Sequence, residues 1–253
     1  MKHITLLIIC FLTVLFISVV VHMPVSFALR YIPEMPSLKI DSPSGTIWAG
    51  EAQNIGWNND NFGHATWQFQ PLTLLQGKAH YSFRFGRGSD AKLMGKGNFG
   101  VGLSGVYAEN VVVSMPAKNV LDQLSMPLPI TVDGNLELSI NEYIYAQPWC
   151  QTATGTLVWN GSQIGSPLGG LELGTVITDL KCEESRLTVT GEHNDNQLTA
   201  SIKGELLPDQ RYNVDALFKP NTEFPKAMKS QLRWLGRPNN NGEYPFTYAG
   251  KLN

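Results

Sequence analysis

Residues 4–21, ITLLIICFLTVLFISVVV, decide how the rest of the chain is placed. This run has no charged residue and no proline, and its only polar side chains are Thr5, Thr13 and Ser18. A helix that begins here and continues to about Val25 reaches ~30 Å, the thickness of a bilayer's hydrocarbon core. A core helix of a soluble domain would carry a polar face, which this run lacks. We therefore predict a transmembrane anchor over residues 4–25, with residues 1–3 as a cytoplasmic tail.

The alternative to an anchor is a cleaved secretory signal. Lys2 and His3 form a short n-region, and Ser26-Phe27-Ala28 has the small–x–small pattern of a cleavage site. Apolar cores of such signals usually span ~7–15 residues, which is shorter than this run. The length favours an uncleaved anchor. Both alternatives place the remainder of the chain outside the cytoplasm.

Composition after the anchor favours a β-rich domain. The 24 glycines and 15 prolines interrupt any long helix, and strand-forming residues are spread throughout. Charged residues make up 16% of the chain and the formal net charge is −2, so there is no basic surplus for nucleic acid. We predict a proline-rich lead-out over residues 26–43 and one β domain over residues 44–253.

Alternation of apolar and polar residues predicts an antiparallel meander, curved or folded into two layers. Glycines bound a short predicted strand around Ile47, and Asn194-Asp195-Asn196 predicts a hairpin turn. Proline positions and apolar spacing predict two short helices, at 116–124 and 225–235. Further strands are predicted at 65–69, 79–85, 107–113, 130–140, 176–180, 186–191, 197–204, 212–218 and 244–252.

A short sequence echo indicates a possible internal repeat. Residues 155–161, GTLVWNG, resemble residues 45–50, GTIWAG, with one residue inserted before the tryptophan. The domain would then consist of related halves, about 44–145 and 146–253. Two matches this short also arise by chance, so the repeat and its absence both stay open.

The three cysteines divide into an isolated one and a pair. Cys10 lies in the predicted anchor, whereas Cys150 and Cys182 are the two in the exported part. In an oxidising compartment the natural interpretation is a disulfide between them, and two free buried thiols are the alternative.

The residues that could act in catalysis or ligand binding lack the neighbouring motif residues that such sites require. Residues 95–100, GKGNFG, match a dinucleotide-binding glycine pattern, but the following VGLSG alternates as a strand, where that motif requires a helix. His64, His80 and His193 are isolated, so no metal site is predicted. Glu183-Glu184 is expected to be a solvated turn rather than an acid–base pair. We predict no catalytic, cofactor-binding or metal-binding residue.

The tryptophans leave two alternatives open. Trp48, Trp57, Trp67 and Trp159 could form an aromatic platform for a ligand. Filling of the core is the commoner reason for aromatic residues spaced along strands. The sequence favours core filling without excluding the platform.

Taken together, the N-terminal anchor and two short motifs resemble the type II secretion system protein N family. The first motif contains Gly45, Thr46, Trp48 and Gly50, and the second contains Gly236, Arg237 and Pro238, followed by Gly242-Glu243-Tyr244 and Tyr248-Ala249-Gly250-Lys251-Leu252. The first motif is also similar to segments of large envelope proteins that carry lipid along grooved β-sheets. The resemblance implies a single-pass inner-membrane component with a periplasmic domain that contacts other type II secretion subunits, with no catalytic residues to transfer.

Three hypotheses about function follow. The first is a non-enzymatic assembly protein tethered to the membrane, whose sheet edges or face contact partners. The second is an envelope protein that binds lipid or another apolar ligand in a β-groove. The third is a periplasmic hydrolase, which would require a convergent carboxylate or Ser/His pair in a pocket. A long apolar sheet face left uncovered favours the second, and a face closed by the 225–235 helix favours the first.

Overall fold

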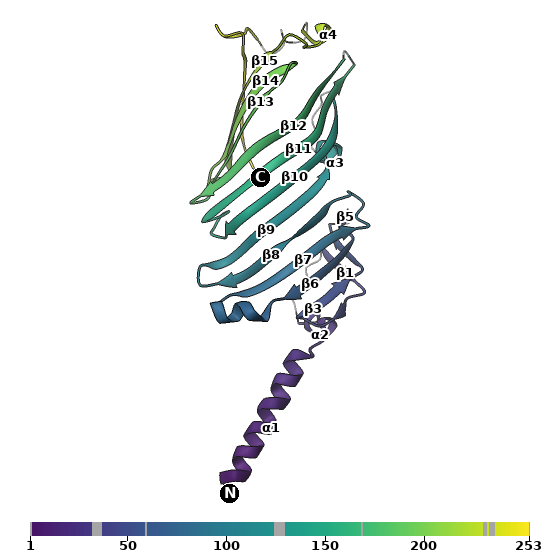
Figure 1. Ribbon diagram of the computed structural model, residues 1–253, viewed down its shortest axis with the longest axis vertical. Helices are drawn as coiled ribbons and strands as arrows, with labels where there is room; N and C mark the ends of the chain where they lie inside the picture. The colour runs from purple at the N-terminus through teal and green to yellow at the C-terminus, as the bar shows by residue number, and fades with distance from the viewer. Residues whose placement is uncertain are drawn as a thin grey trace.

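The computed structural model describes residues 2–31, 37–58, 60–123, 130–167, 169–229, 232 and 236–252. A long helix, α1 (Lys2–Val21), leads into the short helix α2 (Val25–Leu29) and then into a large bent sheet (Figure 1). Residues 4–21 of α1 are long and apolar enough to cross a membrane, and none of this window is buried against the rest of the molecule. Exposure of this much apolar surface to water is unfavourable, so the helix is expected to lie in an apolar environment.

The main sheet contains thirteen strands in the described residues, and every pairing is antiparallel. Strands adjacent in the sheet are also adjacent in the chain, except that β3 pairs with β6. From one edge to the other the strands are β2 (Ser44–Gly45), β3 (Ala49–Ala52), β6 (His64–Phe69), β7 (Ala79–Arg87), β8 (Met94–Gly102), β9 (Gly105–Pro116), β10 (Thr131–Ile144), β11 (Thr152–Ser166), β12 (Gly169–Glu183), β13 (Arg186–Asn194), β14 (Leu198–Leu206), β15 (Arg211–Pro220) and β16 (Tyr244–Lys251).

A small second sheet lies beside the start of the large one. It consists of β1 (Leu38–Asp41), β4 (Asn54–Trp57) and β5 (Asp60–Asn61), in the order β1-β4-β5. The remaining described elements are the 3-10 helix η1 (Pro71–Gln76) and the short helices α3 (Ala117–Gln123) and α4 (Lys226–Lys229). The prediction of a mainly β protein with few short helices is confirmed. The large sheet is one continuous layer.

The two faces of the large sheet differ in polarity because directly paired residues point to the same side. We call one side the apolar face. One row of paired residues on it comprises Gly95, Val113, Leu138, Leu157, Thr178, Gly191, Ile202, Ala216 and Phe246, and the next comprises Val111, Ile140, Gly155, Leu180, Val189, Gly204, Val214 and Tyr248. The intervening row, which points to the other side, is largely polar: Lys96, Val112, Ser139, Thr156, Asp179, Thr190, Lys203, Asp215 and Thr247.

Several local predictions can be compared with these elements. The glycine-rich run at 95–100 lies inside β8, so it is a strand and not a nucleotide-binding turn, as predicted. The predicted helix at 116–124 is α3, which begins after Pro116 because that residue ends β9. The predicted helix at 225–235 is described only as α4 and as Leu232; residues 230, 231 and 233–235 lie outside the described residues.

One prediction near the start of the sheet was wrong in detail. Residues 46–48 form the turn of the β2–β3 hairpin instead of a strand centred on Ile47. The predicted lead-out at 26–43 contains most of α2 as well as the extended strand β1. Residues 32–36 of that lead-out lie outside the described residues.

Candidate interaction surface

The first sequence motif forms the joint between α1 and the sheet. The Trp48 indole Nε1 donates a hydrogen bond to the Val20 carbonyl at 2.8 Å, and the Ile47 backbone N–H donates to the Met23 carbonyl at 3.1 Å. Pro24 forms a β-bridge with Thr46, and Val25 is buried. The last turn of α1 is therefore bonded into the edge of the sheet.

Thr46 and Trp67 hold the hairpin that makes this joint. The Thr46 hydroxyl oxygen accepts hydrogen bonds from the backbone N–H groups of Ala49 at 3.1 Å and Trp48 at 3.3 Å. The Trp67 indole donates to the Thr46 carbonyl at 3.1 Å. Side-chain bonds of this kind stabilise a tight turn, which explains why the motif places a threonine here.

The glycines of the motif are needed for conformation and for space. Gly45 has a φ of +86°, in the left-handed region that L side chains rarely adopt. A Cβ on Gly50 would lie 2.5 Å from the Ser44 carbonyl oxygen and 2.5 Å from Cζ2 of Trp67. Gly50 therefore allows the Trp67 ring to lie across the hairpin.

Replacing Gly50 by alanine is expected to lower the free energy of unfolding by about 1–3 kcal/mol, because the new methyl group overpacks against backbone and the Trp67 ring. Gly56→Ala is the matched control, since its Cβ would approach nothing closer than 3.5 Å. Urea unfolding of the full chain in detergent measures both. Equal stability of the two variants would contradict this account of Gly50.

Aromatic rings run across the apolar face away from this joint. Ring centroids of Trp48 and Phe69 lie 4.9 Å apart, those of Phe69 and Tyr81 lie 5.0 Å apart, and those of Tyr81 and Phe99 lie 5.5 Å apart. These contacts join β6, β7 and β8 in order from the joint. At the far end of this series, Phe99 remains 43% exposed.

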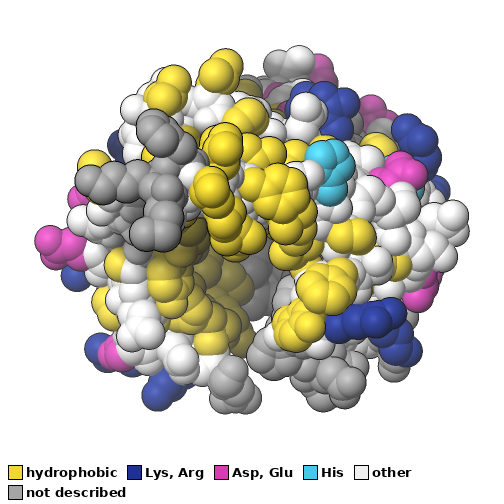
Figure 2. All heavy atoms as spheres, turned by 90° about the horizontal axis from the view of Figure 1, so that it is seen from below, with side chains coloured by type: hydrophobic (Ala, Val, Ile, Leu, Met, Phe, Trp, Pro, Cys, Tyr) yellow, Lys and Arg dark blue, Asp and Glu magenta, His cyan; other side chains and the backbone are white. Residues whose placement is uncertain are grey.

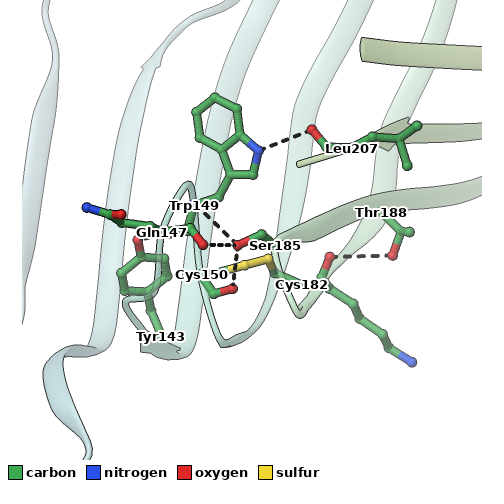
Figure 3. The surroundings of a disulfide bond; sticks show 9 residues. Tyr143, Gln147, Trp149, Cys150, Cys182, Ser185, Thr188 and Leu207 are labelled. Carbon is green, nitrogen blue, oxygen red and sulfur yellow. Dashed lines mark hydrogen bonds between the residues drawn. A yellow bond between two sulfur atoms is a disulfide. The ribbon is translucent and has the colours of Figure 1, made fainter. Parts of the chain in front are cut away.

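A disulfide-tied loop covers one margin of the apolar face (Figure 3). Cys150 and Cys182 form the disulfide that the sequence predicts, with their Cα atoms 6.4 Å apart, and both are buried with Ala153. The Trp149 indole donates to the Leu207 carbonyl at 3.3 Å, and the Tyr143 hydroxyl donates to the Trp149 carbonyl.

The turn after β12 closes this loop from the other side. The buried Ser185 hydroxyl lies 3.1 Å from both the Gln147 and the Cys150 carbonyl oxygens and donates its proton between them. Its backbone N–H donates to the Cys150 carbonyl at 2.8 Å. Glu183, the last residue of β12, and Glu184, in this turn, are both exposed, in agreement with the predicted solvated turn.

The segment after β15 covers the opposite margin of the apolar face. Phe224 and Leu232 are buried against Leu171, Leu173 and Leu198. Met228 of α4 packs against the same cluster, and α4 lies at the end of the molecule far from α1 (Figure 1). We call residues 221–232, as far as they are described, the C-terminal cap.

Asp195 in the β13–β14 turn attaches the C-terminal cap to the sheet. Its carboxylate accepts the backbone N–H groups of Gln197 at 2.7 Å and Leu198 at 2.6 Å and lies 3.0 Å from Nε2 of His193. Its carbonyl accepts a 2.6 Å hydrogen bond from the Asn221 side chain. The turn predicted at 194–196 is therefore confirmed, and it anchors the cap.

Acid is expected to weaken this attachment. Partial burial raises the pKa of the Asp195 carboxyl, but the His193 and backbone hydrogen bonds outweigh it, so the pKa lies below the ordinary 3.8. A lowered folded-state pKa stabilises the fold above the unfolded pKa, and the stabilisation is lost as the pH falls through the folded pKa.

We therefore expect Asp195→Asn to cost about 1 kcal/mol near neutral pH, with the difference from wild type disappearing in acid. Urea midpoints of both proteins across the acidic range measure this change. A difference that stayed constant with pH would show that the ionised carboxylate does not contribute. Asp179→Asn, on the polar face of β12, serves as the control for an exposed carboxyl.

The polar face carries a second cluster that joins β7 to β9. The His80 ring Nδ1 lies 2.9 Å from the Tyr107 hydroxyl, and Lys78 pairs with Glu109 at 3.1 Å. The hydrogen bond that the Lys78 ammonium donates to the Glu109 carboxylate raises the pKa of Lys78, and burial raises the pKa of Tyr107. A surface cavity of about 360 Å³ adjoins this cluster. In the described residues, no three His, Cys, Asp or Glu side chains are grouped so that they could hold a metal ion.

The predicted motif residues do not form one site. Gly45, Thr46, Trp48 and Gly50 lie at the anchor joint, whereas Gly236, Arg237 and Pro238 lie between β15 and β16 at the other edge of the sheet. The surface that the motifs did not reveal is the apolar face. In the sequence, the alternation of apolar and polar residues in each strand indicates this face. The sequence also predicts only two short helices, which are too few to cover a long sheet.

The fold is a single-layer antiparallel β-sheet joined to a helix of membrane-spanning length. Comparison with known proteins identifies the family: the chain matches the one described as type II secretion system (T2SS), protein N, over residues 36–247. It is 41% identical to type II secretion system protein N of Vibrio cholerae serotype O1, covering 96% of both chains, and 31% identical to that of Aeromonas hydrophila, covering 100% of both. The chain belongs to the type II secretion system protein N family. No solved structure matches it significantly.

Proposed function

We propose that this protein is a single-pass inner-membrane component of the type II secretion machinery, with its β domain in the periplasm. Family membership carries the assignment to secretion. The placement is supported by an exposed apolar helix of spanning length and by a disulfide, a bond that persists in oxidising compartments. Residues 1–3, before the apolar run, would remain in the cytoplasm.

The proposed role is non-enzymatic and rests on contacts with other secretion subunits. β16 forms one edge of the large sheet in the described residues, so the backbone groups on its free side can pair with a strand of a partner. Phe246 and Tyr248 on this strand are 45% and 57% exposed. Partner binding at an edge strand requires neither a cofactor nor a catalytic group.

Co-purification tests the secretion role. A tag at Asn253 and a detergent mild enough to keep complexes together should recover other secretion subunits, and intact mass should include the N-terminal segment. A photo-reactive residue at Ala249 on β16 should crosslink to a subunit, whereas one at Asn213 on the paired strand β15 should not. A protein recovered without subunits would overturn the assembly role, and a mass that begins near Leu29 would show a cleaved signal.

Cysteine labelling tests the topology separately. In a Cys10→Ser background, Ser104→Cys places a thiol in the exposed β8–β9 turn. This thiol should react with a membrane-impermeant maleimide in cells whose outer membrane is permeabilised. Lys2→Cys should react only after the inner membrane is broken. The opposite order of labelling would refute a periplasmic domain.

The uncovered apolar face favours a second function, the binding of an apolar ligand. The C-terminal cap, which includes α4, covers one margin of that face and leaves its central rows open. This observation supports the groove hypothesis beside the assembly hypothesis. The two functions are compatible, because a partner can bind the sheet edge while a ligand lies on its face.

A further inference from the structure

The apolar face has the form of a trough with two raised margins. The disulfide-tied loop packs at one set of strand ends, around Cys182, and the C-terminal cap packs at the other, around Leu171. Between them lie the two apolar rows, whose large side chains are half-buried or exposed. Seen from the side of α1, the molecule is hollowed at its centre, with hydrophobic side chains along the hollow (Figure 2).

The floor of this trough carries no charge and offers no free backbone group. From β9 to β15 its polar member is Thr178, whose hydroxyl already donates to the Leu157 carbonyl at 3.2 Å. Backbone N–H and C=O groups of these central strands are used in the ladders on both sides. A ligand there gains from apolar contact alone, which suits a hydrocarbon chain better than a polypeptide with its own backbone groups to satisfy.

The trough is continuous with the membrane anchor. The joint at Trp48 fixes the end of α1 to the sheet, and the aromatic series through Phe69 and Tyr81 runs from there along the apolar face, in a row beside the floor. The 3-10 helix η1 is drawn in blue at the lower edge of the sheet in Figure 1. Its Leu72 and Leu75 side chains are 76% and 88% exposed. These leucines suit the acyl boundary of a bilayer, so the membrane end of the trough opens where lipid is present.

The dimensions also suit lipid. Eleven strands from β6 to β16, spaced ~4.8 Å apart, give a face about 50 Å long. A hydrocarbon core of ~30 Å contains two leaflets, so one acyl chain reaches ~15 Å, or about three strand spacings. The trough can therefore hold more than one acyl chain along its length.

We propose that the apolar face binds the acyl chains of membrane phospholipid, which enter from the bilayer at the anchor joint. The disulfide-tied loop and the C-terminal cap form the walls that keep the chains on the floor. This inference rests on the proposed anchoring of α1 in the membrane. It extends the apolar-ligand function by naming the ligand, its entrance and the residues that contact it.

Photo-crosslinking in cells grown with ³²P-orthophosphate tests the proposal on the full chain. A photo-reactive residue in place of Leu157 points into the trough, and one in place of Thr156 points to the polar face of the same strand. Position 16 in α1 serves as the positive control for contact with the bilayer. We expect several-fold more ³²P on the protein crosslinked at 157 than at 156, with labelled phospholipid released by digestion.

A second variant separates binding from folding. Leu157→Glu places a charge on the floor and should reduce ³²P crosslinking at position 202 several-fold, whereas Thr156→Glu should leave it unchanged. Formation of the Cys150–Cys182 disulfide and recovery with secretion subunits show that each variant is folded and assembled.

Other outcomes would overturn the proposal. Equal label at 156 and 157 would indicate non-specific contact with lipid, and a protein adduct without phosphorus at 157 would show that a partner covers the floor. An unlabelled position 157 in a protein that still recovers secretion subunits would refute lipid binding and leave the secretion role intact. Loss of subunits with lipid label retained would refute the secretion role instead.

Discussion

Replacing Cys150 and Cys182 by serine is expected to lower the free energy of unfolding by about 3–4 kcal/mol. The disulfide joins residues 32 apart in the sequence, and a loop of this length loses about that much chain entropy when it is closed in the unfolded state. The two sulfur atoms are also buried, so their replacement removes packing against Tyr143, Trp149 and Leu187. Urea unfolding of the full chain in detergent, followed by tryptophan fluorescence, measures the loss.

Cys10→Ser is the matched control, because Cys10 is an exposed free thiol on α1. This variant should unfold at the same urea concentration as wild type. Reduction of wild type should reproduce the destabilisation of the double variant. If the double serine variant were as stable as wild type, the disulfide-tied loop would contribute nothing to the fold.

Phe224→Ala is expected to destabilise the protein by about 3–5 kcal/mol, the usual cost of truncating a buried phenylalanine. Phe224 is 4% exposed and lies among Leu171, Leu173, Leu198 and Leu232, so its loss leaves a cavity under the C-terminal cap. The cap should then detach more often, and limited proteolysis at Lys226 and Lys229 should become faster.

Phe246→Ala is the control for the loss of an aromatic side chain from the surface. Phe246 is 45% exposed on the edge strand β16, so about 1 kcal/mol is expected from the apolar area it buries. Similar losses for the two variants, or unchanged proteolysis of Phe224→Ala, would contradict the assignment of Phe224 as the residue that holds the cap.

Much of the fold could be predicted because its signals are local. Residues within a strand alternate with period two, so single strands such as β13 and β15 are visible in the sequence alone. Composition and length alone show that the uncharged run at 4–21 can form a helix of membrane-spanning length. The glycine pattern at 95–100 was also correctly assigned to a strand, because the residues after it alternate.

Features that depend on distant residues could not be predicted in the same way. At the joint, the Trp48 indole donates a hydrogen bond to a carbonyl 28 residues earlier in the chain. Strand β3 pairs with β6, because the intervening strands β4 and β5 belong to the small second sheet. Residues 46–48 alternate as a strand would. They form a turn instead, because the Thr46 hydroxyl accepts hydrogen bonds from the backbone N–H groups of Trp48 and Ala49. Such contacts follow from the packing of the whole molecule.

The candidate interaction surface likewise has features that the sequence predicts and features that only the tertiary structure shows. The sequence by itself determined the apolar helix of membrane-spanning length, the antiparallel β class and the cysteine pair, because each depends on composition, spacing or compartment. The tertiary structure alone decided that the sheet is one layer and that its apolar face stays open between two covered margins. Alternation shows which side chains share a face, but whether that face is covered depends on where segments far along the chain, such as the one that carries Phe224, pack against it.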